Sequence, residues 1–433
     1  MAKAKSKPLY QVHESTLSNG LKIRLVPNPS VPVVSLYTFF HVGSRNERPG
    51  ITGIAHLFEH MMFNGAKRYG PKEFDHVLES HGGRSNAYTS TDLTVYYDEF
   101  APEALERVLD LESDRMESLA IAPKLLTSER KVVLEERRVR VDNDITGMMD
   151  EELNALVFKA HPYHWPIIGW QDDVKRITRE ECREFFRTYY APNNATLWIS
   201  GDIDVKKTLA LVKRFYGKIK KGPPAPVVPN SEPAQKGERR AVVRHPAQAP
   251  AVMLAYRGPE ARHQDTFVLD VLQYVLSAGE GNRLTRELVY KQKVAVGVGF
   301  DWSWRKDPGI LWLYLELEPG ADPKKAEAAL YAELERISQK PPLQAEVQKA
   351  KNMIRAHLFR ELATNGGRAH ALGNYEALLG DWREAERLPG KYENITPEHV
   401  QALAKKYFHP DRRSVVTLEP LPVDESAGPE VAA

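Results

Sequence analysis

The sequence predicts an α+β fold made of two similar halves, each a mixed or antiparallel sheet packed with helices. Three observations predict it: strand patterns come before long helical patterns, a proline-rich stretch divides the 433-residue chain near its middle, and one motif recurs across that division. The motif is "ITREECREFFRTYYAPNNATLWISG" and then "ITPEHVQALAKKYFHPDRRSVVTLE". Its marker residues share one offset of 218, which is typical of a duplicated unit: Ile177 and Ile395, Tyr190 and Phe408, Pro192 and Pro410.

The first half begins with strand patterns. Asn19-Gly20 separates "YQVHESTL" from "LKIRLVPN", which predicts two strands joined by a tight hairpin turn. The stretch "VPVVSLYTFFHV" predicts a third strand, buried because it is almost entirely apolar. Helical patterns follow at 54–64 and 71–80, and Gly82-Gly83 ends the second of them. Next, "NAYTSTDLTVYYDEF" at 86–100 predicts one strand, and further helices are expected at 102–119 and 123–141.

The division between the halves lies at residues 218–240, "KIKKGPPAPVVPNSEPAQKGERR". Five prolines between Pro223 and Pro233 predict an extended linker, since proline cannot continue a helix or a central strand. We therefore expect an N-terminal domain at 1–219, a linker at 220–240 and a similar C-terminal domain at 241–420. Residues 421–433 are small and polar, which predicts a flexible tail.

The composition excludes several classes of function. The chain has 60 basic and 58 acidic residues, a net charge of +2, and no basic block, which argues against nucleic acid as a partner. No window approaches the ~20 apolar residues of a membrane span. Cys182 is the only cysteine, so neither an internal disulfide nor a cysteine-rich metal site is expected. The N-terminus lacks the apolar run of a secretory signal, which predicts a cytoplasmic protein, or a periplasmic one if a signal peptide has been removed.

The stretch "GIAHLFEHMMFNG" places three polar residues in an apolar helical run. His56, Glu59 and His60 occupy positions i, i+3 and i+4, which lie on one helix face. Two imidazoles one turn apart can bind one zinc ion, and the carboxylate beside them can take a proton from a water that the metal polarises. In isolation, two histidines on a helix are as readily explained by a surface position or a satisfied core position.

A catalytic zinc site needs a third protein ligand. The candidate lies in "SERKVVLEERRVR", where Glu129 and Glu136 stand two helical turns apart on one face. A solvated face, paired with the arginines at 130, 137 or 138, is the simpler interpretation of these carboxylates when they are taken alone.

Together these motifs resemble the pitrilysin–insulinase family of zinc peptidases, the inverzincins with a His-x-x-Glu-His motif, including bacterial and mitochondrial processing-type members. "HLFEHMMFNG" is followed 76 residues after His60 by Glu136, with Glu129 seven residues before that. "LSNGLKIRLVPN", "NAYTSTDLTVYYDEF", "ERKVVLEERR" and "HPYHWPIIGW" extend the resemblance along most of the chain. It implies two similar halves with the zinc site in the first, and hydrolysis of unstructured peptides in a closed chamber.

The resemblance also implies roles for individual residues. His56, His60 and Glu136 would hold one zinc ion per chain, and Glu59 would be the general base. Glu129 would orient one of the histidines, as metal-bound imidazoles require. Asn86 and Ala87 match the edge strand that hydrogen-bonds the substrate backbone.

The second half departs from the family pattern. Self-sufficient members carry an arginine and, seven residues later, a tyrosine that hold the substrate, in a pattern such as "SRLFQEIREKRGLAYSV". Here the matching stretch is "NRLTRELVYKQKVAVGV", with Val289 and Val296 at those two positions. Neither side chain can donate a hydrogen bond. The sequence therefore predicts the zinc-bearing subunit of a heterodimer, whose homologous zinc-less partner supplies the Arg/Tyr clamp. The alternatives are a self-sufficient homodimeric oligopeptidase and a non-catalytic structural subunit of the same fold.

Overall fold

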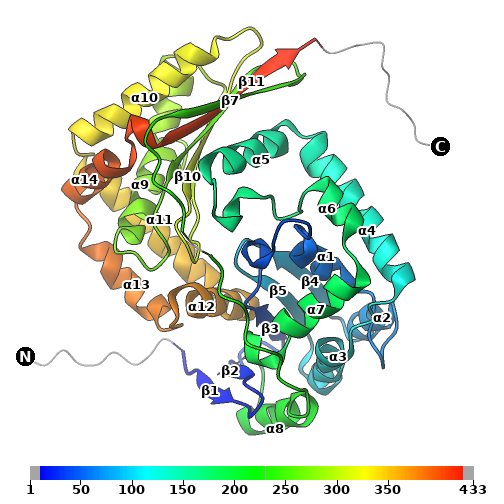
Figure 1. The fold of residues 1–433 in the computed structure, drawn as a ribbon. Coiled ribbons are helices and arrows are strands. Elements are labelled where there is room, and N and C mark those ends of the chain that lie inside the picture. The colour runs from blue at the N-terminus through cyan, green and yellow to red at the C-terminus, as the bar shows by residue number, and fades with distance from the viewer. Residues whose placement is uncertain (1–9, 230, 423–433) are drawn as a thin grey trace, which may run out of the picture. The chain divides into compact units, whose positions relative to one another are not determined.

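The computed structural model of the chain describes residues 10–229 and 231–422. The described residues form two compact units (Figure 1). Unit 1 contains residues 10–137, 165–229 and 358–388, and unit 2 contains residues 138–164, 231–357 and 389–422. Each unit is built on one β-sheet. None of the helices within the described ranges is both long and apolar enough to cross a membrane.

The sheet of unit 1 has six strands in the order β1-β2-β6-β3-β5-β4. The strands are β1 (His13–Thr16), β2 (Lys22–Pro27), β3 (Val34–Phe40), β4 (Arg84–Thr89), β5 (Thr94–Phe100) and β6 (Ala195–Gly201). Only β2 and β6 run parallel, and the other neighbours are antiparallel. Every residue of β3 and β6, the two central strands, is buried. β4 forms one edge of the sheet.

As far as the chain is described, the sheet of unit 2 repeats this topology without an equivalent of β1. Its order is β7-β11-β8-β10-β9, and only β7 and β11 run parallel. The strands are β7 (Arg239–Pro246), β8 (Ala251–Arg257), β9 (Gly297–Trp302), β10 (Ile310–Glu316) and β11 (Arg413–Leu421). The duplicated motif forms α7 (Arg179–Tyr189) with β6 and α14 (Pro397–Tyr407) with β11, at the predicted offset. The predicted α+β fold with two similar halves is therefore confirmed.

The remaining helices surround the two sheets. They are α1 (Ile54–Met61), α2 (Glu73–Ser80), α3 (Leu105–Ser118), α4 (Pro123–Arg137), α5 (Ile145–Val157), α6 (Gln171–Arg176), α8 (Val205–Tyr216), α9 (Thr266–Ser277), α10 (Pro323–Gln339), α11 (Gln344–Glu361), α12 (Asn365–Leu379) and α13 (Glu384–Glu393). No helix or strand is assigned to residues 217–229 or 231–238, and the linker at 220–240 stays a prediction.

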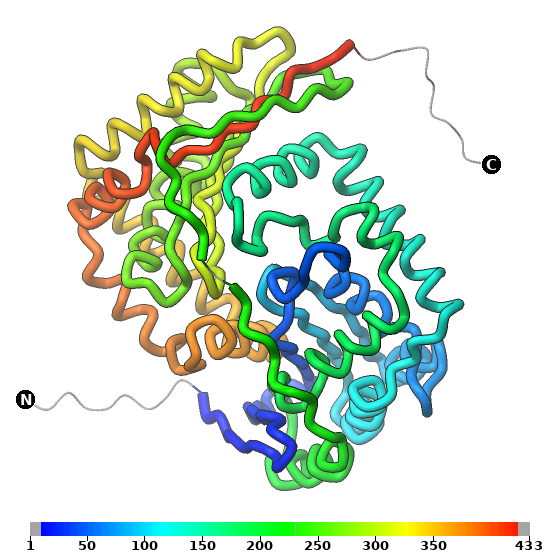
Figure 2. Tube along the Cα trace, in the orientation of Figure 1, coloured from blue at the N-terminus to red at the C-terminus, as the bar shows by residue number. Residues whose placement is uncertain are grey.

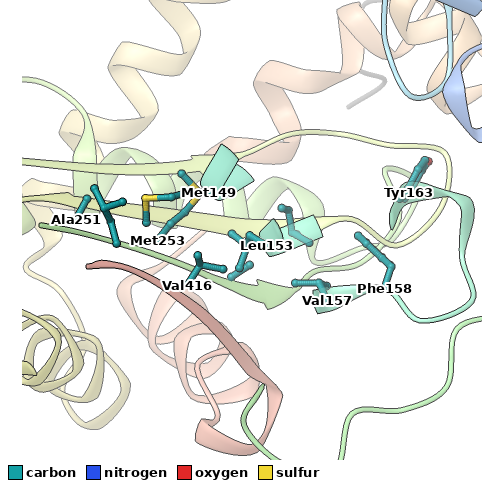
Figure 3. Close-up of a cluster of buried hydrophobic side chains, with 11 residues drawn as sticks. Met149, Leu153, Val157, Phe158, Tyr163, Ala251, Met253 and Val416 are labelled. Carbon is teal, nitrogen blue, oxygen red and sulfur yellow. The ribbon is translucent and has the colours of Figure 1, made fainter. Parts of the chain in front are cut away.

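Two helices pack on the sheet of the opposite sequence half. α5 comes from the first half but belongs to unit 2, where Met149, Leu153 and Val157 pack against Ala251, Met253 and Val416 of the sheet (Figure 3). α12 comes from the second half but belongs to unit 1 and packs on β3 and β6. This path of the chain can be followed by colour in Figure 2. The domains at 1–219 and 241–420 stay a prediction from the sequence. The two compact units do not follow these bounds, because α5 belongs to unit 2 and α12 to unit 1.

Three predicted elements differ from those observed. The strand expected at 86–100 is two strands, β4 and β5, because Ser90 and Leu93 close a turn between them with Ser90 N donating to Leu93 O over 2.8 Å. The helix expected at 54–64 ends at Met61. The helix expected at 123–141 is α-helical only to Arg137 and continues as a π-helix over Arg138–Asp142. Of the predicted tail at 421–433, residues 423–433 lie outside the described residues.

Candidate metal centre

The helix that carries the motif is buried in unit 1. α1 begins after Gly53, whose φ of 86° is left-handed, and its apolar residues are fully buried. The hydroxyl of Tyr96 donates to the carbonyl of Phe58 over 2.9 Å, and the ring of Phe58 stacks on that of Tyr190. A helix fixed on several sides has little freedom to turn its polar residues toward water. His56 is accordingly only 8% exposed.

His56 and His60 face Glu136 of α4. Glu136 Oε2 lies 3.5 Å from His56 Nε2 and 3.2 Å from His60 Nε2. Each residue of the trio offers one ligand atom, and these atoms all lie within 4.8 Å of one another. A tetrahedral zinc ion with bonds of 2.0–2.1 Å has ligand atoms about 3.3–3.4 Å apart, so the two measured distances fit such an ion. Within residues 10–229 and 231–422, no other three His, Cys, Asp or Glu side chains converge in this way.

The second helix, α4, presents its carboxylates to α1. Val133 is fully buried, and Glu136, one turn later, has a side chain only 19% exposed. Glu129 Oε2 lies 3.8 Å from His60 Nδ1, on the opposite side of the imidazole from Glu136. Arg130 and Arg137 donate to backbone carbonyls, at Ile177 and Gly169. Glu129 and Glu136 therefore face the two histidines of α1 and do not form a solvated helix face.

Burial and neighbouring charges shift the pKa values of Glu59 and His60. Burial raises the pKa of the Glu59 carboxyl and the charge of Glu136 adds to this, while hydrogen bonds from Thr89 and the charge of His60 oppose it. For His60, burial lowers the pKa, but the hydrogen bond to Glu136 and the surrounding glutamate charges outweigh burial, so the net shift is upward. A carboxylate with a raised pKa is suited to general base catalysis.

The predicted substrate strand is β4. Its inner edge pairs with β5, with Asn86 opposite Tyr97 and Ala87 opposite Tyr96, and it forms the end of the sheet as far as the chain is described. The Asn86 side chain is exposed and accepts a hydrogen bond from the backbone N–H of Ala87 over 2.8 Å. Thr89, in the same strand, contacts Glu59, so the strand ends beside the proposed base.

Two residues of this region carry no signal that sequence patterns detect. Thr89 lies beside Glu59 only because β4 and α1 pack together. Glu47 accepts hydrogen bonds from the N–H groups of Gly53 and Ala55, over 2.8 and 2.9 Å, and so caps the first turn of α1. It stands six residues before Gly53, which is not the spacing of a capping box.

The stretch of the second half aligned with the Arg/Tyr clamp lies in unit 2. It forms a π-helix over Thr285–Lys291 and leads into β9. Lys293 has a φ of 52°, in the left-handed region that favours glycine. The family pattern has a glycine at that position, so the backbone agrees with the ungapped alignment that places Val289 and Val296 at the clamp positions. Val296 is 45% exposed.

Comparisons with known proteins agree with the motif. Residues 22–170 match the family model of insulinase, peptidase family M16, and residues 176–354 match the model described as the peptidase M16 inactive domain. The zinc protease PqqE of Helicobacter pylori is 32% identical over 419 residues, which is 94% of this chain and 93% of that protein. A zinc protease of Mycobacterium leprae is 28% identical over 402 residues, 92% of this chain and 89% of that one.

Solved structures share the fold. A protease from Helicobacter pylori superposes with a TM-score of 0.92 at 30% identity, over 95% of this chain and 100% of that chain. The periplasmic protease PqqL from Escherichia coli superposes with a TM-score of 0.76 at 22% identity, over 96% of this chain but only 49% of that one. The motif, the fold and these relatives lead to one conclusion: the chain belongs to the M16 (insulinase/pitrilysin) family of peptidases.

Proposed function

We propose that this chain is a zinc-dependent endopeptidase acting on unstructured peptides, and the zinc-bearing subunit of a heterodimer. The observation that carries the proposal is the convergence of His56, His60 and Glu136: the distances from Glu136 Oε2 to the two imidazole Nε2 atoms, 3.5 and 3.2 Å, are close to those between ligands of a tetrahedral zinc ion. The relatives named zinc proteases support the choice of zinc.

The residues of the chain divide the chemistry between them. His56, His60 and Glu136 would hold the metal, and Glu129 would orient His60 through its Nδ1 atom. A zinc ion held there supplies Lewis acidity toward water and the scissile carbonyl. Glu59 accepts the proton of the attacking water and returns it to the leaving amine. Burial favours this exchange, because it raises the pKa of Glu59 and makes its protonated form accessible.

An extended peptide is the substrate that fits the neighbouring strand. β4 lacks a second neighbour in the described sheet, and an edge strand can pair with the backbone of an added segment. A peptide paired along Asn86 and Ala87 would run toward Thr89 and hence toward Glu59. Folded proteins cannot offer a free extended segment, which favours unstructured peptides.

The heterodimer follows from Val289 and Val296, which replace the clamp of self-sufficient members. The left-handed Lys293 supports the alignment on which this comparison depends. The fold match to PqqL supports pairing, since that chain is about twice as long as this one and could contain two such folds. The expected partner is a homologous subunit with the arginine and tyrosine but without the zinc ligands.

Two variants test the zinc chemistry. Glu59→Gln should bind zinc as the wild type does and lose peptide hydrolysis, because it retains the ligands and lacks the base. Glu136→Gln should lose most of its zinc affinity. Metal analysis and cleavage of a quenched peptide, measured together with the partner, check both outcomes. Zinc-free wild-type protein, or retained activity in Glu59→Gln, would refute the proposal.

The clamp is tested by restoring it. The wild-type chain alone should be nearly inactive on a quenched peptide, and the double variant Val289→Arg, Val296→Tyr should gain turnover. An electrostatic donor at the reacting carbonyl is worth about 10²–10³ in rate, which sets the expected gain. Val296→Phe in place of the tyrosine is the matched control, because it adds the ring without the hydroxyl. Strong turnover by the wild-type chain alone would instead support the self-sufficient homodimer.

A further inference from the structure

Two of the three proposed zinc ligands lie near helix boundaries. His56 is the third residue of α1, and Glu136 is the last but one of α4, before the π-helix that follows it. The separation of the start of α1 and the end of α4 therefore sets the separation of these two ligands. Metal sites tolerate deviations of about 0.2 Å in ligand distances, so something must hold the two ends firmly.

The segment before α1 and the segment before α6 meet at a pair of glycines. Gly53 precedes α1, and Gly169 lies in the segment before α6; both have left-handed φ angles, 86° and 81°. A Cβ atom on Gly53 would lie 2.5 Å from the carbonyl oxygen of Ile168, and one on Gly169 would lie 2.3 Å from that of Thr52. The two backbone segments are thus packed too closely for any side chain between them. We call this contact the glycine junction.

Two buried side chains attach the junction to the ligands. Arg137 Nη1 donates to the carbonyl of Gly169 over 2.8 Å, and Arg137 directly follows Glu136. On the other side, Glu47 accepts from the N–H groups of Gly53 and Ala55, and Ala55 directly precedes His56. Arg137 and Glu47 are each only 6% exposed. A continuous set of contacts thus joins one ligand to the other without passing through the ligand side chains.

We propose that Arg137 and Glu47 are positioning residues that hold Glu136 and His56 at zinc-binding distance through the glycine junction. The inference rests on the zinc site proposed above. Residues that orient metal ligands change metal affinity about 10–100-fold when they are replaced. Loss of either contact should therefore weaken zinc binding by that factor, although neither residue touches the metal.

Each positioning residue has a matched control in the same unit. Arg130 lies on the same helix and also donates to backbone carbonyls, those of Lys175 and Ile177, but away from the junction. Glu181 is likewise a glutamate that accepts a backbone N–H at the start of a helix, that of Thr178 before α7, and lies away from the junction. Arg137→Gln is compared with Arg130→Gln, and Glu47→Gln with Glu181→Gln.

The zinc dissociation constant, measured by competition with a chelator, should rise about 10–100-fold in Arg137→Gln and Glu47→Gln and remain near wild type in the controls. The visible spectrum of the Co²⁺-substituted proteins should change in the same two variants, since it reports coordination geometry. Arg137→Lys, which keeps a donor, should recover part of the affinity and serves in place of Arg137→Gln if that variant does not fold. Equal zinc affinities in the variants and the controls would overturn the positioning role of Arg137 and Glu47 and leave the proposed function standing. Absence of zinc binding in the wild type would overturn the proposed function.

Discussion

The glycine junction can be tested at its tightest point by Gly169→Ala. The new Cβ atom would lie 2.3 Å from the carbonyl oxygen of Thr52, where ordinary contacts begin at 3.4 Å, so one segment must move by roughly 1 Å. Overpacking of this kind costs about 1–3 kcal/mol, and the left-handed backbone costs a non-glycine residue about 1–2 kcal/mol more. A shift of this size also exceeds the tolerance of about 0.2 Å for metal ligands.

The control is Gly82→Ala, because Gly82 has a left-handed φ of 66° with nothing within 4 Å of its missing Cβ. It should lose only the backbone contribution of about 1–2 kcal/mol and bind zinc normally. Gly169→Ala should lose about 2–5 kcal/mol in urea unfolding of the metal-free protein, and its zinc affinity should fall at least about tenfold. If the two variants have the same stability and the same zinc affinity, the junction does not position the ligands.

Three further predictions concern other parts of the chain. Burial raises the pKa of Asp270 to about 7. The folded state therefore holds its proton more tightly than the unfolded state, and the wild type should lose about 2 kcal/mol relative to Asp270→Asn as the pH of urea unfolding rises from 5 to 7. Lys293→Gly should raise the free energy of unfolding by about 1 kcal/mol, because glycine favours the left-handed backbone. A lower free energy of unfolding would contradict the alignment that places Lys293 at the glycine of the family pattern. Thr89→Val removes a hydroxyl that lowers the pKa of Glu59, so the acid limb of the pH profile of kcat/KM should move to higher pH. An acid limb at the wild-type pH would show that the Thr89 hydroxyl does not act on Glu59.

Local patterns predicted most of the strands and helices and singled out the three polar residues of α1. The spacing of His56, Glu59 and His60 places them on one helix face by geometry alone, and the offset of 218 residues predicted the duplication. Glu136 required the family resemblance. No local pattern indicates which of many exposed-looking glutamates will face a helix 76 residues earlier, because that depends on tertiary packing.

The predictions that differed have identifiable physical causes. The turn at Ser90–Leu93 interrupts a run with strand propensity, and its serine side chain accepts the N–H of Leu93, a local competition that the strand pattern hides. The exchange of α5 and α12 between the sequence halves could not be predicted, because an apolar helix face does not specify which of two similar sheets it covers.

One buried polar residue in unit 1 and one exposed apolar residue in unit 2 depart from the usual rules of burial, and this contrast agrees with the proposed heterodimer. In unit 1, His56 is 8% exposed on a helix whose apolar residues are fully buried, where a polar group needs partners, and Glu136 Oε2 lies 3.5 Å from its Nε2 atom. In unit 2, Val296 is apolar yet 45% exposed, at a position where the family places a functional tyrosine. Sequences break local rules mainly at functional sites, where the gain in function offsets the cost. The first departure is what a metal centre requires. The second removes a hydrogen-bond donor without gaining burial, which is expected where a partner subunit provides the clamp.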